Sequence, residues 1–447
     1  MRDTIFALAS GAGRAGVAVI RVSGPGALES LQSLTGVSDL FPRQLLCKSL
    51  REPVSRETID RAMVVAFPGP GSYTGEDVVE YHLHGSPAVV RQMLEVLGQQ
   101  KGHRMAEPGE FTRRAFENGK MDLTAAEAVA DLVNAETALQ KEQALAQMGG
   151  ALSRLYDGWR TELSRILAYV EAEIEFPDED LPRNLLEEVT PDLQELIRAL
   201  LGHLNDGRRG ERLREGVSVA VIGAPNAGKS SLVNALAQRD VAIVSDLAGT
   251  TRDIIEVHLD IGGYPVILSD TAGLRPEDLF SEDGHAQVEA EGIRRARECA
   301  LTADIRVLVY DGTQVQTDPS TEALAHSFSL RVVNKSDLGV RVDLSEPFIP
   351  VSIKMGEGLD VFLKALEGLI ASTFVERAAE APALTRLRHR EALNACLEAL
   401  WRCQQARLPE LLAEDLRLAV RHLGRITGRV DIEDLLDIVF RDFCIGK

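Results

Sequence analysis

The sequence is short of cysteine, of long apolar runs and of positive charge. Its five cysteines are an odd number and include no C-x-x-C pair, which argues against a disulfide framework and a zinc site and fits a reducing cytoplasm. No stretch approaches the roughly 18 apolar residues of a membrane span. The first residues hold too short an apolar run for a signal peptide. A cytoplasmic protein without a membrane partner is therefore expected.

The shortage of positive charge limits the kind of partner. With a formal net charge of −19, non-specific binding of nucleic acid through bulk charge is disfavoured. A nucleic-acid partner would need a local basic patch or an intermediary protein. The length of 447 residues predicts about three domains.

The strongest local signal is a glycine-rich loop at residues 223–230 (GAPNAGKS), which matches G-x-x-x-x-G-K-[ST]. The apolar run 217–222 predicts a strand before it, and 231–237 predicts a helix after it. The glycines let backbone N–H groups turn toward phosphates, and the helix N-terminus adds partial positive charge. Lys229 is expected to reach the outer phosphates and the Ser230 hydroxyl to bind Mg²⁺.

Four further motifs follow in the order that a GTPase requires. A threonine of G-T-T-R-D (249–253) offers a hydroxyl for the Mg²⁺ shell. In D-T-A-G (270–273), Asp270 can hold Mg²⁺ through water, and the Gly273 N–H can meet the γ-phosphate. These positions predict nucleoside triphosphate hydrolysis.

The last two motifs select the base. In N-K-S-D (334–337), the Asp337 carboxylate can accept hydrogen bonds from guanine N1–H and the N2 amine, neither of which adenine offers. S-I-K (352–354) has isoleucine where such loops usually have alanine, and its backbone N–H can read the guanine carbonyl. The base is therefore expected to be guanine.

The residue after D-T-A-G is Leu274, where Ras-type GTPases place a glutamine that orients the attacking water. Leucine cannot do this, so another side chain must. The candidates are Glu289, Glu291, Arg275 and Arg252. Taken alone, each is more simply a solvated charge.

The fold class expected is a multidomain α/β and α protein. Residues 1–119 are expected to form an α+β domain, with strands at 4–9, 17–22, 61–67 and 78–83 and a helix at 87–97. Residues 214–375 alternate strand and helix as a doubly wound P-loop domain does. Helical patterns fill 120–213 and 376–447, so the α/β domain is expected to be inserted into a discontinuous helical domain.

Within the first helical part, three finer features are expected. Thr124-x-x-Glu127 matches a capping box at a helix start. A helix is predicted at 191–204. The polar, Arg-rich segment 205–216 is interpreted as a linker.

Several motifs resemble those of a known group of GTPases. The P-N-A-G-K-S loop, G-T-T-R-D and D-T-A-G-L-R resemble those of the TrmE-Era-like GTPases. Three others narrow the resemblance: F-P-G-P-x-S-Y-T-G-E-D, P-G-E-F-T-R-R-A-F-x-N-G-K-M-D-L and the C-terminal F-C-I-G-K. With these, the whole chain resembles the MnmE (TrmE) family of tRNA modification GTPases.

The resemblance implies a function. Members have an N-terminal domain that binds a tetrahydrofolate derivative, a helical domain and an inserted G domain. As homodimers, they join the flavin-containing partner MnmG (GidA) in a heterotetramer. Together these build an aminomethyl or carboxymethylaminomethyl group on C5 of the wobble uridine of tRNA, and GTP hydrolysis drives the conformational cycle.

The resemblance also implies roles for single residues. For K⁺, around which the G domains would dimerise, the matching positions are Asn226, Ser245, Leu247 and Thr250; for Mg²⁺ they are Ser230 and Thr251. Glu289 becomes the favoured water-orienting catalytic residue. The GTP-binding positions expected from motifs and resemblance together are Asn226, Ala227, Gly228, Lys229, Ser230, Ser231, Ser245, Asp246, Leu247, Ala248, Gly249, Thr250, Thr251, Asp270, Thr271, Ala272, Gly273, Asn334, Lys335, Ser336, Asp337, Ser352, Ile353 and Lys354.

For folate, the matching positions are Arg21, Glu80, Lys120 and Lys447. A carboxylate can accept from the pterin's guanidine-like edge, and cations can pair with the glutamate tail. Cys444 is a candidate catalytic thiol, or else a small buried residue. Without the resemblance, Arg21 and Lys120 would be interpreted as surface charges.

Two rival functions stay open on the sequence alone. One is a GTP-controlled binding module, such as a ribosome-assembly GTPase without modifying chemistry. The folate positions and the F-C-I-G-K tail argue against it. The other is a folate-dependent one-carbon transferase that GTP merely regulates, which predicts that tRNA nucleosides do not depend on the protein.

Overall fold

The computed structural model describes residues 3–37, 41–175, 185–239, 241–243, 256–270, 298–375, 382–406, 408–430, 433–441, 443 and 445–446. The chain divides into two compact units. The first comprises residues 1–130, 147–193 and 394–447, and the second comprises 131–146 and 194–393. Each contains one six-stranded sheet.

The sheet of the first unit has the strand order β3-β4-β5-β2-β1-β6. Neighbouring strands run antiparallel except β1 and β6, which are parallel. The strands are β1 Thr4–Leu8, β2 Ala15–Ser23, β3 Leu46–Arg51, β4 Thr58–Phe67, β5 Val78–Gly85 and β6 His103–Met105.

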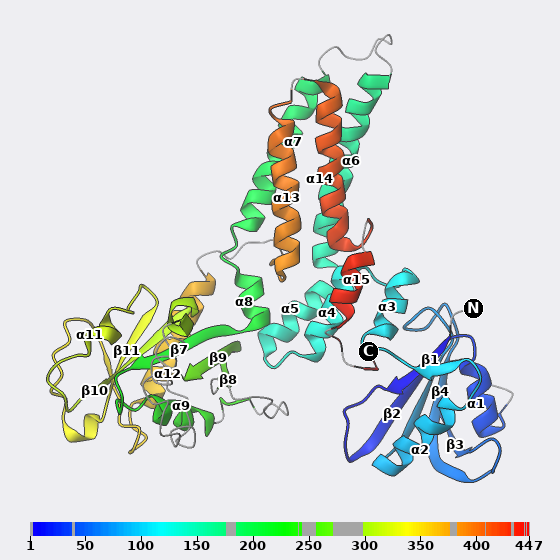
Figure 1. Cartoon of the computed structure of the whole chain (residues 1–447), viewed down its shortest axis with the longest axis horizontal. Coiled ribbons are helices and arrows are strands. Elements are labelled where there is room, and N and C mark those ends of the chain that lie inside the picture. Colours follow the sequence, from blue (N-terminus) through cyan, green and yellow to red (C-terminus); the bar gives the residue numbers. More distant parts are fainter. Residues whose placement is uncertain are drawn as a thin grey trace, which may run out of the picture. The chain divides into compact units, whose positions relative to one another are not determined.

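Alternation along the strands gives this sheet one buried face and one mixed face. On β5, Val79, Tyr81 and Leu83 are fully or almost fully buried. They belong to a core shared with helices α1 (Ala27–Thr35) and α2 (Pro87–Gly98), which lie beside the sheet in Figure 1. The intervening residues of β5, among them Glu80 and His82, point to the opposite face.

The sequence predicted four of these six strands and the helix α2 with small errors at their ends. It did not predict α1, β3, β6 or α3 (Glu110–Glu117). Segments β3 and β6 are short, and at least half of each is polar, so they carry no clear alternation of apolar residues. They become strands because neighbouring strands supply hydrogen-bond partners.

The capping box predicted at Thr124 is wrong. Helix α4 (Leu123–Val133) begins one residue earlier, and Asp122 caps it, because its Oδ1 accepts the Ala125 N–H at 2.9 Å. The Thr124 hydroxyl instead bonds the Asp122 carboxylate and Ser153 Oγ, each at 2.8 Å. A carboxylate two residues before the predicted cap thus takes the capping role.

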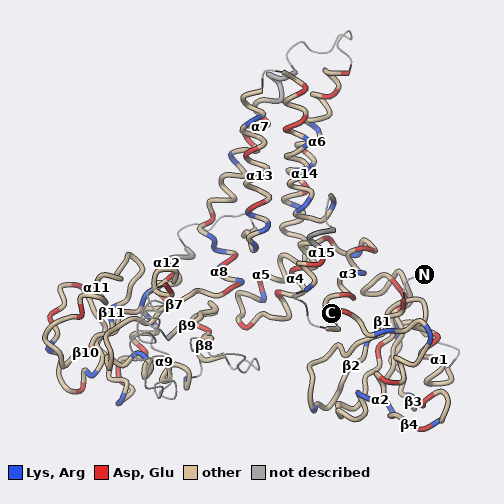
Figure 2. The backbone as a smooth tube through the Cα atoms, viewed as in Figure 1, with Lys and Arg blue, Asp and Glu red and all other residues tan. Residues whose placement is uncertain are grey.

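Long helices complete the first unit. Helix α6 (Ala151–Glu175) packs along α14 (Pro409–Thr427) through Leu163, Ile166 and other buried residues. Figure 2 shows both basic and acidic residues along these helices. Helix α15 (Glu433–Arg441) follows, and Phe440 and Phe443 join Leu123 of α4 in a separate buried cluster.

The sheet of the second unit has the order β12-β11-β10-β7-β9-β8. All its pairs are parallel except β8 with β9. The strands are β7 Val217–Gly223, β8 Glu256–Ile261, β9 Tyr264–Asp270, β10 Ile305–Asp311, β11 Ser329–Asn334 and β12 Ile349–Pro350.

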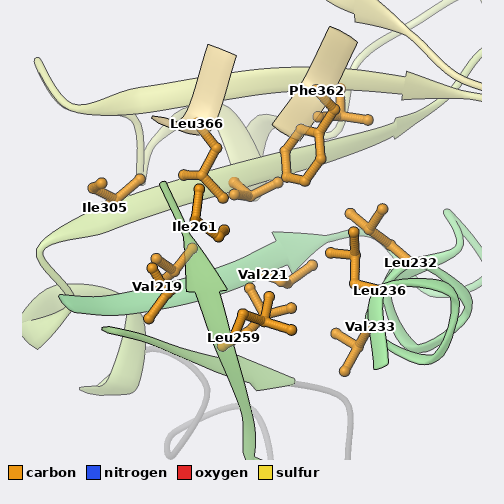
Figure 3. Close-up of a cluster of buried hydrophobic side chains, with 14 of the residues drawn as sticks. Val219, Val221, Leu232, Val233, Leu236, Leu259, Ile261, Ile305, Phe362 and Leu366 are labelled. Carbon is orange, nitrogen blue, oxygen red and sulfur yellow. The ribbon is translucent and has the colours of Figure 1, made fainter. Parts of the chain in front are cut away.

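This sheet is buried on both faces, as parallel sheets are. Figure 3 shows one face, where Val219 and Val221 of β7 meet Leu232 and Leu236 of helix α9 (Lys229–Ala237) and Phe362 of α12 (Leu359–Val375). On the other face, Ile222 and Leu308 belong to a second cluster with Ala300 and Val342. The prediction of a doubly wound P-loop domain is confirmed for this part.

The linker predicted at 205–216 is wrong, because most of it forms helix α8 (Arg209–Glu215). Glu211 is almost completely buried and accepts from Arg208 Nε at 2.5 Å and Arg390 Nε at 2.9 Å. Arg390 also donates to Asp206 at 2.8 Å. A segment that looked solvated is therefore ordered by ion pairs with residues distant in sequence.

Helix α11 (Pro319–Glu322) also belongs to the second unit. The division between the units falls within α4, α5 (Ala138–Met148), α7 (Leu185–Leu204) and α13 (Leu387–Cys403). Helix α7 begins six residues before the predicted 191, and Pro191 lies inside it. The domain boundaries proposed from the sequence stay predictions. Across the described residues, no helix combines the length and apolar character that a bilayer span needs.

Candidate functional site

The glycine-rich loop connects the end of β7 to the start of α9, as the sequence predicted. Two residues have left-handed backbones: Asn226 at φ 63° and Gly228 at φ 107°. A Cβ on Gly228 would lie 2.1 Å from Asn334 Nδ2, so only glycine fits there. The loop therefore brings its backbone close to a second motif.

The side chain of Lys229 reaches back across the glycine-rich loop. Lys229 Nζ donates to the carbonyls of Gly223 at 2.8 Å and Ala224 at 3.0 Å. Ser230 and Ser231 are exposed in the first turn of α9, where the N–H groups lack partners within the helix. Backbone donors, an ammonium and a hydroxyl thus gather at one helix N-terminus, which suits a polyphosphate with its Mg²⁺.

Asn334 joins three of the predicted motifs. It is buried at the end of β11, and its Nδ2 donates to the carbonyl of Ala227 at 2.9 Å. Its Oδ1 accepts the N–H of Ile353 at 3.3 Å. The glycine-rich loop, N-K-S-D and S-I-K therefore form one site at the carboxyl edge of the sheet, where parallel α/β sheets bind ligands.

A hydrogen bond from a buried serine holds the carboxylate that is expected to recognise the base. Asp337 is exposed, and its Oδ1 accepts from Ser352 Oγ at 2.7 Å. Ser352 itself is fully buried, and Ser336 N–H bonds the carbonyl of Val351 at 3.1 Å. One oxygen of Asp337 is thus fixed while the side chain faces solvent, an arrangement that suits recognition of the paired donors of guanine.

One acidic residue of this region was missed by the motifs. Asp311 ends β10 next to Asn334, and its Oδ2 accepts from Lys335 Nζ at 2.6 Å. Burial raises the pKa of Asp311, but hydrogen bonds from Lys335 and Thr313 outweigh this and hold that pKa below its ordinary value. The signal in the sequence was a carboxylate at the end of an apolar strand beside another motif-bearing strand.

The structure describes the first residue of D-T-A-G. Asp270 ends β9 beside Val221 of β7, which places its backbone next to the glycine-rich loop.

Many other predicted site residues lie outside the described residues. The positions outside are Ser245, Asp246, Leu247, Ala248, Gly249, Thr250, Thr251, Thr271, Ala272, Gly273, Glu289, Cys444 and Lys447, together with Leu274, Arg252, Arg275 and Glu291.

In the N-terminal sheet, two of the positions matched to folate pair directly. Arg21 on β2 faces Glu80 on β5 across the strands, and both its Nε and Nη2 lie 3.0 Å from Glu80 Oε1. The side chains are 17% and 18% exposed, so the ion pair is mostly desolvated. His82 Nε2 lies 3.4 Å from the other carboxylate oxygen.

Aromatic rings and a glycine-rich turn surround this pair. The Arg21 guanidinium lies 5.2 Å from the ring centre of Tyr73 and 5.7 Å from that of Phe111. Lys120 Nζ donates at 2.9 Å to the carbonyl of Pro70, in the same turn as Tyr73. The turn 68–75 therefore contacts two of the matched positions, Arg21 through Tyr73 and Lys120 through Pro70.

Comparison with known proteins identifies the family. A family model described as "GTP-binding protein TrmE N-terminus" matches residues 4–120, and one described as "MnmE helical domain" matches residues 123–444. A protein of Parvibaculum lavamentivorans, "tRNA modification GTPase MnmE", is 53% identical over the full length of both chains. The chain belongs to the MnmE family of tRNA modification GTPases.

A second relative supports the same family. A protein of Rhodospirillum rubrum with the same description is 52% identical, over 100% of this chain and 99% of its own. Among solved structures, the G domain of the T. maritima FeoB iron transporter is 24% identical over 34% of this chain and 98% of its own, but its TM-score of 0.25 is too low to bear on the fold. The resemblance drawn from the sequence motifs is confirmed, as is the expectation of a GTPase.

Proposed function

We propose that this GTPase hydrolyses GTP to drive modification at C5 of the wobble uridine of tRNA. A flavin-containing partner supplies redox chemistry, and a tetrahydrofolate derivative supplies the one-carbon unit. The observation that carries this proposal is the coexistence of a guanine-nucleotide site and the desolvated Arg21–Glu80 pair in a chain that matches the family throughout.

The nucleotide site supports hydrolysis of GTP in particular. Lys229 and the N-terminus of α9 provide positive charge for the phosphates, and Asp337 provides the acceptor for guanine. Glu289 remains the proposed residue that orients the attacking water, because Leu274 has no polar atom to do so.

The donors present suit the proposed cations. Ser230 offers a hydroxyl at the start of α9 for Mg²⁺, and Thr251 is proposed as the second ligand. Asn226 offers an exposed amide on the left-handed turn of the loop, and oxygen donors of this kind suit K⁺. Ser245, Leu247 and Thr250 are proposed to complete that site. Bound K⁺ would add positive charge where other GTPases use an arginine finger.

The N-terminal pair has the chemistry that a reduced folate requires. Glu80 can accept from the amino and ring N–H groups of a pterin, while Tyr73 and Phe111 provide flat apolar surface. Arg21 and Lys120 can pair with the carboxylates of the glutamate tail. We propose Lys447 as a further cation and Cys444 as a thiol of the same site.

The proposed assembly is a homodimer that joins the partner MnmG and tRNA. Dimerisation of the G domains around K⁺ would activate hydrolysis. A tRNA substrate is compatible with a net charge of −19 if a partner protein or a local patch provides the positive charge.

Reconstitution tests the proposal. The full chain, the flavin partner, wobble-uridine tRNA, a tetrahydrofolate one-carbon donor and GTP are incubated in K⁺, and the tRNA nucleosides are then analysed. We expect a C5-modified uridine that requires each component, and faster phosphate release in K⁺ than in Na⁺ at equal ionic strength. Unmodified tRNA with all components present would contradict the proposal, and equal rates in the two salts would remove the role of K⁺.

A further inference from the structure

Two carboxylates flank strand β10, and their local contacts are closely matched. At its end, Asp311 Oδ1 accepts from Thr313 N–H at 3.0 Å and Thr313 Oγ1 at 2.7 Å, and Oδ2 accepts from Lys335 at 2.6 Å. Just before its start, Asp304 Oδ2 accepts from Ser218 N–H at 3.1 Å and Ser218 Oγ at 2.8 Å, and Oδ1 lies 2.9 Å from Arg212 Nε. Each therefore holds one amide, one hydroxyl and one cation.

The two differ in what their cation is connected to. Lys335 stands between Asn334 and Asp337, two residues before the carboxylate that reads the base. Arg212 belongs to α8, which precedes β7. It therefore lies at the amino end of that strand, whereas the glycine-rich loop lies at the carboxyl end. Only the Asp311 cluster is thus continuous with the nucleotide site.

Backbone hydrogen bonds and close contacts hold the Asp311 cluster in place. Gly312 N–H donates to the carbonyl of Asn334 at 2.8 Å, and a Cβ on Gly312 would lie 2.8 Å from that same oxygen. Arg341 N–H donates to the carbonyl of Gly312 at 2.8 Å. The backbone of Lys335 is left-handed, at φ 64°, which few residues other than glycine adopt. The segment after β10 therefore constrains Lys335 through its ammonium and through the backbone of its neighbour.

We infer that Asp311 is a positioning residue for guanine nucleotides: it anchors the Lys335 ammonium so that the four-carbon stem forms a fixed apolar edge beside the base-reading Asp337. The side chains are 15% exposed at Asp311 and 35% at Lys335, so the bond is partly shielded from water and stronger than a surface pair. Asp311 touches neither the base nor the reacting phosphate in this role. The inference rests on the guanine-nucleotide binding of the proposed function.

Asp311→Asn and Asp304→Asn form a matched pair for the test. We expect D311N to raise the Kd for GDP and the KM for GTP about tenfold, because an amide cannot hold the ammonium in the same way. At saturating GTP, kcat should stay within about twofold, since the lost interaction is the same in ground and transition states. D311N should also weaken the binding of inosine triphosphate, which lacks the N2 amine, by the same factor as the binding of GTP. D304N should leave both constants unchanged and lower only the Tm.

Equal effects of D311N and D304N on GDP affinity would overturn the inference, as would wild-type affinity in D311N. A wild-type chain that binds no GDP would instead count against the nucleotide site itself. Lys335→Met, which keeps the stem but not the ammonium, gives a second readout. D311N added to K335M should change affinity by no more than about twofold, whereas a further tenfold loss would show that Asp311 acts independently of Lys335.

Discussion

The two six-stranded sheets of this protein build their candidate sites in different ways. In the parallel sheet of the second unit, the site lies in loops beyond the carboxyl ends of the strands, and Asn334 joins three of them. In the N-terminal sheet, Arg21 and Glu80 face each other from the middle of antiparallel strands. Within each of these loops, the motif residues lie next to one another in sequence, whereas the cross-strand partners Arg21 and Glu80 are 59 positions apart.

The difference decides which side chains specify a ligand. In the loops, backbone N–H groups and short motifs do most of the binding, so single side chains such as Ile353 can vary. On the N-terminal sheet, one carboxylate and one guanidinium are proposed to carry the polar contacts, and the two pair with each other at 3.0 Å. Independent sites of these two kinds should respond independently to mutation.

The largest effect is expected for Asp337→Asn. The amide cannot accept both guanine donors, so kcat/KM for GTP should fall on the order of 1000-fold. Xanthosine triphosphate should become the better substrate, because the amide can donate to the carbonyl at its C2. Phosphate-release assays with both nucleotides measure this.

Folate binding provides the control for this change. If the two sites are separate, D337N binds tetrahydrofolate as tightly as the wild type in calorimetry. A loss of folate affinity in D337N would show that the sites are coupled and would break the comparison.

The reciprocal change is Glu80→Gln on the N-terminal sheet. It keeps the shape of the side chain but leaves the shielded Arg21 without its counter-ion, so affinity for tetrahydrofolate should fall by about tenfold or more. Calorimetry with the full chain measures this. GTP hydrolysis in the absence of tRNA and partner is the internal control and should not change. Unaltered folate binding would remove Glu80 from the proposed site.

The two units are expected to lose stability at different pH values. Burial lowers the pKa of His203 in α7 to about 4, with nearby Asp206 opposing and Arg390 adding to the shift. Since the unfolded imidazole has a pKa of about 6.5, stability is full above that pH and falls by about 3 kcal/mol as pH drops from 6.5 to 4.

Glu110 in the N-terminal region behaves differently. Burial opposes its ionisation, but Arg104, Glu107 N–H and Arg114 lower its pKa below 4.5, so its contribution is lost only below that pH. Hydrogen exchange, corrected for intrinsic rates, should therefore show α7 and α8 losing protection between pH 6.5 and 4.5 while β1 and β5 keep it. His203→Asn should abolish the difference; its persistence in that variant would assign it to another group.

The smallest effect is expected for Ile353→Ala, which restores the alanine usual in such loops. Because the backbone N–H is the group proposed to read the guanine carbonyl, GTP affinity should stay within about twofold. Titration with a fluorescent GTP analogue measures this. A tenfold loss would mean that the side chain, which lies 3.5 Å from the ideal Cβ position of Gly228, shapes the loop.

The same contrast explains how far the sequence alone could predict the structure. The strand β7, the helix α9 and their loop were predicted because every residue of G-x-x-x-x-G-K-S is contiguous. Arg21 and Glu80 were found only by resemblance, since strand pairing depends on the turns and strands between them. Helix α8 was missed because its stability comes from Glu211 and Arg390, 179 positions apart, rather than from its own composition.

Asp311 lies between these cases. Its position at the end of an apolar strand was visible, but its partner Lys335 directly follows the neighbouring strand β11, which pairs with β10 in parallel. The rule that carboxyl ends of parallel strands meet would have selected it. No linear motif includes it.

The most direct measurement is nucleoside analysis of tRNA after reconstitution with D337N, the flavin partner and the tetrahydrofolate donor, supplied with either GTP or xanthosine triphosphate. If hydrolysis in this site drives the modification, the C5-modified uridine should form with xanthosine triphosphate and not with GTP, and E80Q should form little with any nucleotide. Modified uridine at wild-type levels from D337N with GTP, or from E80Q, would contradict the account.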